Sequence, residues 1–251
     1  MTGVRLTAAL SLLLAAAVLL PDQGAVAAER PSVDGWPGFA VGRVNIRGGG
    51  FCTATLIGQH RAVTAARCLR DGASAWYGVD RIVVELAPHR ATRKGYAPVT
   101  AFQPAPGLIF LEDGTPNDPA RDWAVLELGE ESPRDPDVQP VGLASPAERA
   151  ALRPGSLLSL VAYTSQRPYV ATLADGCRVQ EVRGQPQVVL HDCAASAAVA
   201  GAAVLAETEE GTVLVGIQVG TGALDGRPVG VAALLERRIE PAALLGSAAG
   251  P

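Results

Sequence analysis

Lysine is nearly absent from this chain: Lys94 is the only one among 251 residues, and the formal net charge is −4. A protein that binds nucleic acid or an anionic membrane through charge carries a run or a face of basic residues. The sequence holds no such run. We therefore expect no nucleic-acid partner and no charge-driven contact with a membrane.

Histidine is also scarce, and the common nucleotide and metal motifs are missing. The three histidines, His60, His89 and His191, are spread along the chain instead of clustering with cysteines, which argues against zinc. There is no P-loop, no GxGxxG between a strand and a helix, no HExxH and no EF-hand loop. We expect no cofactor and no metal site.

Only the N-terminus has a long hydrophobic run. Leu6–Leu20 follows Arg5, and the small residues at 25–28 offer a cleavage site, a pattern typical of a secretory signal peptide. An uncleaved membrane anchor is the alternative, but a run of about 15 residues is shorter than the ~20 that a spanning helix needs. The sequence predicts a signal peptide over 1–28 and a secreted or periplasmic protein without a membrane span after cleavage.

Cysteine is limited to four residues, Cys52, Cys68, Cys177 and Cys193. An even number in an oxidising compartment predicts disulfides. Three pairings are possible, and the spacing favours two local bridges, Cys52–Cys68 and Cys177–Cys193. Each bridge would close a strand–turn–strand unit and contribute on the order of 3 kcal/mol.

The remaining chain is a series of short β-prone runs separated by turn signals. With 48% hydrophobic and 18% charged residues, it is able to bury a core. This pattern of short strands and turns predicts an all-β sandwich or barrel. The expected strands are Ala40–Ile46, Cys52–Ile57, Arg61–Ala65, Arg81–Ala87, Tyr96–Phe102, Asp122–Leu128, Val138–Leu143, Leu157–Tyr163, Val170–Leu173, Arg178–Val182, Gln187–His191, Thr212–Val219 and Pro228–Leu234.

Three segments are expected to lie outside strands. Pro104–Ala120 is rich in Pro, Gly, Asp and Asn and predicts a long loop. Ser145–Gly155 predicts a linker between two sets of strands, with one or two helical turns at Ala147–Leu152. Glu236–Leu245 predicts a short closing helix, although Pro241 lies inside it.

Three motifs carry a resemblance to a known family, and they occur in that family's order. Phe51–Leu69 reads FCTATLIGQHRAVTAARCL, Arg121–Leu128 reads RDWAVLEL, and His191–Leu205 reads HDCAASAAVAGAAVL. The chain resembles the chymotrypsin/trypsin-like serine proteases. The lead-in WPGFAVGRVNI at Trp36–Ile46, followed by GGGFC, is most similar to the secreted bacterial glutamyl endopeptidase-like branch.

The resemblance implies a double β-barrel. Residues 29–145 would form an N-terminal antiparallel six-stranded barrel and residues 146–251 a C-terminal one. Together they would make one trypsin-like peptidase domain with a short C-terminal helix. The resemblance, and not the spacing of the strands, selects this double barrel over other all-β folds.

The resemblance also implies where a catalytic triad would lie, and two of its three members are missing. Asp122 matches the aspartate that orients the catalytic histidine. The histidine position holds Arg67, whose guanidinium stays protonated at physiological pH and cannot accept a proton from a serine. The nucleophile position holds Ala200, which has no hydroxyl. Hydrolysis by this mechanism is therefore expected to be undetectable.

The surrounding positions depart from the family as well. The oxyanion-equivalent positions are Ala198 and Ala200, and Val199 stands between them where the family has an acidic or amide residue. Gln218, in the strand that resembles the wall of the specificity pocket, replaces a histidine common in the glutamate-cutting branch. Gln218 either hydrogen-bonds a side chain that enters the groove or faces solvent.

Arg67 has two expected roles. A buried carboxylate needs a partner, and arginine offers N–H donors. We predict that Arg67 turns toward Asp122 and forms an ion pair. In the alternative, Arg67 points into solvent and Asp122 receives backbone donors.

The sequence therefore favours a secreted protease homologue without catalytic activity that binds a peptide, a protein or an inhibitor in the former substrate cleft, as a monomer. The alternative is an active serine endopeptidase with relocated groups, for which Ser196 and Thr64 are nearby hydroxyls and His60 and His191 nearby histidines. Without a catalytic role, Ser196 is expected to be an ordinary loop serine, and His191 a strand-end histidine hydrogen-bonded to backbone. A purely structural role in the cell envelope is a third hypothesis.

Overall fold

A computed structural model describes residues 30–31, 35, 37–72, 75–129, 135–185, 187–193 and 199–235. The expected signal peptide over 1–28, the expected helix Glu236–Leu245, and Ala198 and Ser196 lie outside these residues.

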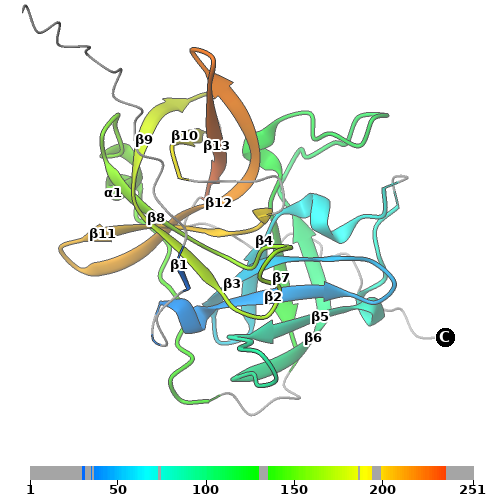
Figure 1. Ribbon diagram of the computed structural model, residues 1–251. Coiled ribbons are helices and arrows are strands. Elements are labelled where there is room, and N and C mark those ends of the chain that lie inside the picture. The colour runs from blue at the N-terminus through cyan, green and yellow to red at the C-terminus, as the bar shows by residue number, and fades with distance from the viewer. Residues whose placement is uncertain are drawn as a thin grey trace, which may run out of the picture.

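The N-terminal half of the described chain forms a closed antiparallel barrel (Figure 1). The strand order around this barrel is β2-β3-β4-β7-β6-β5, and the pairing of β2 with β5 closes the ring. Buried and more exposed residues alternate along β5 and much of β6, as expected for strands with one face in a core. The strands are β2 (Val41–Ile46), β3 (Phe51–Gly58), β4 (Arg61–Thr64), β5 (Ile82–Leu86), β6 (Gly95–Pro104) and β7 (Ala124–Leu128).

The C-terminal half forms a second closed antiparallel barrel beside the first (Figure 1). Its strands are ordered β9-β10-β13-β12-β11-β8, and a pairing between β8 and β9 completes the circle. A two-residue strand, β1 (Arg30–Pro31), adds to β9. The six strands are β8 (Leu157–Ala162), β9 (Thr172–Arg183), β10 (Val188–His191), β11 (Ala203–Thr208), β12 (Gly211–Leu224) and β13 (Arg227–Leu234). The expected double six-stranded barrel is confirmed.

In the described part of the chain, helical structure is confined to short turns. They are η1 (Gly38–Ala40), η2 (Ala66–Leu69), η3 (Val79–Arg81), η4 (Pro119–Arg121) and α1 (Pro146–Ala150). At the start of α1, the Ser145 hydroxyl accepts from the Glu148 N–H while the Glu148 carboxylate accepts from the Ser145 N–H, a capping box that fixes where the helix begins. Within the described ranges, no helix has the length and hydrophobicity required to cross a membrane.

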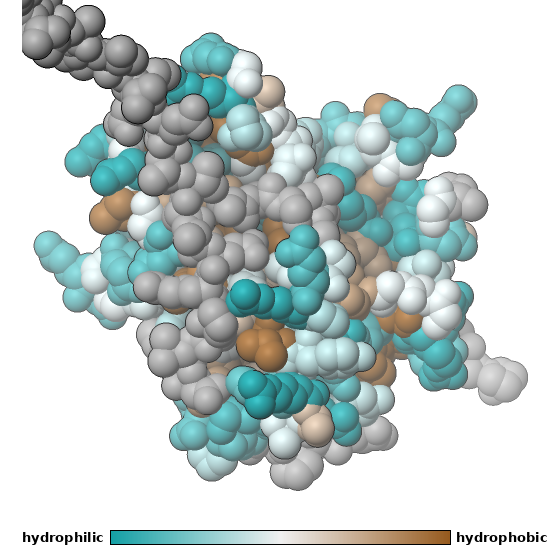
Figure 2. All heavy atoms as spheres, in the orientation of Figure 1, coloured by the Kyte–Doolittle hydropathy of each residue, from teal (hydrophilic) through white to brown (hydrophobic). Residues whose placement is uncertain are grey.

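The buried apolar residues form two clusters. The first fills the N-terminal barrel and continues through the junction, where Val161, Tyr163, Leu205 and Ile217 of the C-terminal barrel join it. The second fills the interior of the C-terminal barrel. On the face shown in Figure 2, hydrophobic residues lie as separate patches among hydrophilic ones.

Polar contacts also join the two barrels. The Thr53 hydroxyl of β3 accepts from the Tyr163 N–H at 2.9 Å, and the Tyr163 hydroxyl donates to the Pro88 carbonyl at 3.2 Å. Arg43 donates through Nη1 to the Pro168 carbonyl at 2.7 Å. Thr53 and Tyr163 are buried, so their polar atoms depend on these partners instead of water.

Three strand predictions were wrong or incomplete. Val138–Leu143 forms no strand, and Pro140 interrupts it. Its backbone makes single hydrogen bonds to both barrels: Val141 N donates to the Leu56 carbonyl of β3, and the Gly142 carbonyl accepts from Leu214 N of β12. Val170–Leu173 and Arg178–Val182 belong to the single strand β9, because the Asp-Gly pair between them lies where the β8–β9 register shifts and not in a turn. Strands β1 and β11 were not expected.

Replacing Thr53 by valine tests the hydrogen bond from the Tyr163 N–H to the Thr53 hydroxyl, which joins the two barrels. The variant keeps the side-chain shape but leaves the buried Tyr163 N–H without its acceptor, which costs about 1–3 kcal/mol. For a chain of this size we expect the midpoint of thermal unfolding to fall by roughly 2–4 °C per kcal/mol. Thr100→Val, at an exposed hydroxyl that donates to the Glu127 carbonyl, is the matched control. Equal effects of the two substitutions would contradict a joint at Thr53.

Candidate functional site

The candidate site begins where β4 ends. After Thr64 the chain enters η2, which carries Arg67, and Ala66 N donates to the Asp122 carbonyl at 3.3 Å. A disulfide joins Cys68 of η2 to Cys52 of β3. Hydrogen bonding and a covalent bridge therefore both fix the position of Arg67. The second expected bridge, Cys177–Cys193, is also present.

Asp122 is held by the turn that precedes it. The Asp118 carboxylate accepts from the Ala120 N–H at 2.9 Å and caps η4, and Asp122 follows as the last residue of that turn. The Asp122 side chain is 0% exposed. It therefore presents a carboxylate inside the protein, within hydrogen-bonding distance of η2.

Arg67 satisfies this carboxylate in two ways. Its backbone N–H donates to Oδ1 of Asp122 at 2.9 Å, and its Nε donates to Oδ2 in an ion pair. The predicted contact between Arg67 and Asp122 is confirmed. The arginine side chain is still 39% exposed, so only its inner edge is engaged.

Opposing effects act on the pKa of Asp122. Burial favours the neutral form and raises the pKa, while the charge and hydrogen bonds of Arg67 lower it, and the net direction is upward from 3.8. The partner at position 67 is a permanent cation and donor. It is able to stabilise the aspartate charge, but it has no lone pair with which to take a proton from a hydroxyl.

The nucleophile-equivalent position lies on a tight turn against the other barrel. The Ala200 carbonyl accepts from Thr53 N at 3.1 Å, and Gly201 N donates to the Gln218 carbonyl at 2.8 Å. Gly201 has φ +80°, and a Cβ there would lie 2.1 Å from the Thr53 carbonyl oxygen. Only glycine fits this position. The Thr53 carbonyl also accepts from the hydroxyl of Thr64, the last residue of β4 before η2, so the turn at Ala200 and the Arg67–Asp122 pair belong to one junction.

His191 and Gln218 form a buried pair that the sequence did not predict. Both are inaccessible to water, and His191 Nε2 lies 2.7 Å from Gln218 Oε1. The Gln218 amide nitrogen donates to the Gly220 carbonyl, which directs its oxygen toward the imidazole. The expectation that His191 bonds to backbone was wrong, and so was the alternative that Gln218 faces solvent.

The neighbours of His191 keep it neutral. Because Gln218 offers it an oxygen, Nε2 carries the proton, and Nδ1 has no partner among the described residues. Burial lowers the pKa of His191, against smaller opposing effects of Gln218 and Asp192. Gly230 pairs with His191 on β13, and a Cβ there would lie 2.2 Å from the ring. A glycine opposite a strand-end histidine was the available sequence signal for this contact.

The groups considered for a relocated mechanism are not assembled in the described part of the chain. The Thr64 hydroxyl is buried and donates to the Thr53 carbonyl at 2.7 Å, so its proton is engaged. His60 lies in the exposed turn between β3 and β4, at the opposite end of β4 from Arg67. Across the same residues, no three His, Cys, Asp or Glu side chains are placed to hold a metal ion.

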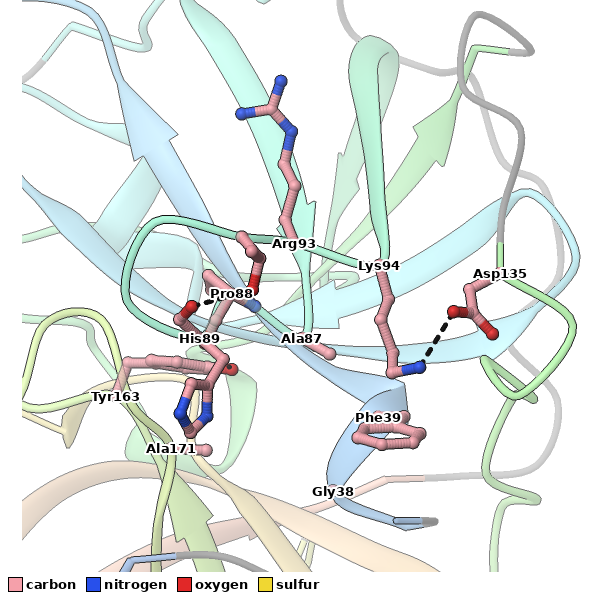
Figure 3. A pocket seen from close by; sticks show the side chains of 11 residues that line it. Gly38, Phe39, Ala87, Pro88, His89, Arg93, Lys94, Asp135, Tyr163 and Ala171 are labelled. Atoms are coloured by element: carbon pink, nitrogen blue, oxygen red, sulfur yellow. Dashed lines mark hydrogen bonds and ion pairs between the residues drawn. The ribbon is translucent and has the colours of Figure 1, made fainter. Parts of the chain in front are cut away.

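A cavity of about 480 Å³ lies between the barrels, lined by residues other than the predicted site (Figure 3). Lys94 crosses its rim, donating to the Asp135 carboxylate at 2.8 Å, with Nζ 4.4 Å from the centre of the Phe39 ring. Asp135 raises the pKa of Lys94. Figure 3 shows Arg93 directed away from the cavity. The charged lining of this cavity is thus compensated internally.

Two antiparallel barrels with a buried aspartate, an N-terminal-barrel disulfide and a glycine turn at their junction define the two-barrel peptidase class of proteins. The family model described as "Trypsin-like peptidase domain" matches residues 52–217, and the chain belongs to this family. The matched region runs from the first cysteine through the Arg67–Asp122 pair and the Ala200 turn to β12. A search of curated proteins finds no match.

Replacing Arg67 by alanine tests the ion pair through its pH dependence. Loss of the guanidinium removes the charge that lowers the pKa of Asp122, so this pKa rises further above 3.8. Above the raised pKa the variant buries an unpaired charge, and we expect a loss of about 1–3 kcal/mol, moderated by solvent screening of the partly exposed arginine. Toward pH 4 the carboxyl group binds a proton and the loss shrinks.

The measurement is urea unfolding of wild type and Arg67→Ala at pH 7 and pH 4. Arg61→Ala is the matched control, because Arg61 is 40% exposed and ion-paired to Glu127 on the surface. The control should lose less than about 1 kcal/mol. A loss for Arg67→Ala that is the same at both pH values would rule out the proposed coupling to Asp122.

His191 is expected to make stability fall below pH 6.5. Its pKa in the folded state lies below the ordinary 6.5, so the unfolded chain binds the proton first. The contribution of neutral His191 to the free energy of unfolding is therefore fully present above pH 6.5. It declines as the pH falls toward the folded-state pKa, by at most about 1.4 kcal/mol per pH unit. Urea unfolding between pH 7.5 and 5 should show this slope in wild type and in His89→Gln, whose histidine is exposed. A slope that survives in His191→Gln would refute this origin.

Proposed function

We propose that this protein is a secreted or periplasmic trypsin-like peptidase homologue without peptidase activity, which acts by binding a peptide or protein ligand in the former substrate cleft. The observation that carries the proposal is the guanidinium of Arg67 at the base position, engaged with Asp122. A group that stays protonated and has hydrogen-bond donors but no acceptor cannot activate a nucleophile.

The nucleophile position supports the same conclusion. Ala200 supplies no hydroxyl, and the nearby buried hydroxyl of Thr64 is committed to the Thr53 carbonyl. In a protease with an intact triad, loss of the nucleophile or of the base each costs on the order of 10⁶ in turnover. With both replaced, residual hydrolysis would depend on the oxyanion site, and Ala198 replaces glycine there.

A binding role fits what the chain retains. Both barrels, the two disulfides and the main-chain turn at Ala200 and Gly201 are present, which supports retention of the peptidase scaffold without its reactive groups. Disulfides are compatible with a location outside the cytoplasm. The partner is expected to be a peptide or protein segment, bound by a monomer. The likeness to the glutamyl endopeptidase branch rests on the motifs at the N-terminus.

The test is reaction with a fluorophosphonate, which labels an activated serine, together with hydrolysis of casein. We expect neither labelling nor hydrolysis above background for the wild type. The variant Arg67→His with Ala200→Ser supplies a base and a nucleophile on the same backbone and is expected to gain labelling at position 200. That variant also serves as the positive control for the assay.

Labelling of the wild type that disappears in Ser196→Ala would overturn the proposal and establish a relocated serine mechanism. Casein hydrolysis by the wild type without labelling would overturn it as well, and would indicate chemistry at another group. Retention of a protein from the secreted fraction by the wild type, with neither labelling nor hydrolysis, would support the binding role.

A further inference from the structure

The guanidinium of Arg67 has more donors than Asp122 uses. Arginine carries five N–H groups in a planar fork, and Asp122 engages only Nε together with the backbone N–H. No acceptor for the Nη atoms lies within hydrogen-bonding distance among the residues that the structure describes. The side chain is 39% exposed. Up to four charge-bearing N–H bonds are thus left for another group.

The direction of these donors is set by the buried pair. A guanidinium is rigid and flat, so fixing Nε against a fully buried carboxylate also fixes the plane of the group. The outer edge then lies on the side away from Asp122, toward the exposed surface. A free surface arginine pays side-chain entropy to hold a ligand in one geometry, whereas Arg67 is already held.

The fork geometry selects a particular acceptor. Two parallel N–H bonds from Nη1 and Nη2 match the two oxygens of a carboxylate. We propose that the outer edge of Arg67 is a carboxylate-binding site for an acidic peptide, which rests on the proposed binding role of the cleft and specifies its ligand. The acceptor is the side chain of an aspartate or glutamate, or the C-terminal carboxylate, of the bound segment.

Charge balance limits the strength of the contact. Asp122 already offsets the charge of Arg67, and the whole chain carries a formal net charge of −4, so no long-range field draws an acidic ligand to the site. The contact acts at hydrogen-bonding range. We expect roughly a tenfold preference for a carboxylate over its uncharged amide counterpart, as for one charge-assisted hydrogen bond at a partly exposed group.

The experiment uses synthetic hexapeptide mixtures as probes. The protein is expressed from the full chain, purified and immobilised. The first mixture contains Asp and Glu at randomised positions, and the second contains Asn and Gln at the same positions. Both are acetylated and amidated, so that side chains are the only source of carboxylates. A third arm repeats the second mixture with free C-termini and thereby separates a C-terminal carboxylate from an acidic side chain. Retained peptides are counted by mass spectrometry.

Three variants accompany the wild type. Arg67→Gln with Asp122→Asn removes the fork while leaving a neutral pair that remains able to hydrogen-bond, and its thermal unfolding shows whether it folds. Arg67→Lys keeps the positive charge but loses the planar fork, and it should retain less than the full preference. Arg61→Gln removes an equally exposed arginine at the other end of β4 and should leave the preference unchanged.

The outcomes separate this inference from the proposed function. The inference is supported if wild type and Arg61→Gln retain carboxylate peptides about tenfold better than their amide counterparts, and if this preference is lost in Arg67→Gln with Asp122→Asn and reduced in Arg67→Lys. Equal retention of all three mixtures overturns the carboxylate site and leaves the binding role standing. No retention of any of the three mixtures overturns both. Cleavage of the peptides overturns the proposed function, and the ratio of acidic to amide peptides consumed still decides for or against the carboxylate site.

Discussion

The carboxylate of Asp122, fully withdrawn from water, constrains the junction between the two barrels. A charge in such a place needs donors close by, because burial otherwise favours its neutral form. Among the residues that the structure describes, the donors come from Arg67, through its backbone and its side chain. To bring them there, η2 is turned inward after β4 and tied to β3 by the Cys52–Cys68 bridge. A histidine or an arginine at position 67 meets this demand, but only a histidine can also accept a proton.

Much of this arrangement was predictable because it is local or is recorded in motifs. Strands such as β5 show the alternation of buried and exposed positions, and the two disulfides join cysteines of equal, short separation. The Arg67–Asp122 contact followed from a motif alignment and from the cost of an unpaired buried charge. This prediction did not depend on knowing how the two barrels pack, since a buried aspartate needs a hydrogen-bond donor or a positive charge beside it in nearly any packing.

The failures share a different cause. Val138–Leu143 has the composition of a strand, but its backbone bonds are divided between both barrels, which no window of sequence reveals. Asp175–Gly176 has the composition of a turn, yet β8 pairs with β9 on both sides of it, at Ala174 and at Cys177, and β9 continues through it. The pairing of His191 with Gln218 depends on strands that are distant in the sequence. Each of these outcomes was decided by a long-range partner instead of by local preference.

The turn at Ala200 and Gly201 is held through atoms that every residue possesses. Its bonds to Thr53 and Gln218 use main-chain N–H and carbonyl groups, and its one special requirement is the missing Cβ of Gly201. A side chain at position 200 contributes none of these bonds. The side chain at position 200 packs, partly buried, against the core, but the bonds that hold the turn do not depend on it, so a substitution there changes the chemistry of the site while these bonds remain. Such a division allows one architecture to be inherited intact by lineages that differ in whether they catalyse anything.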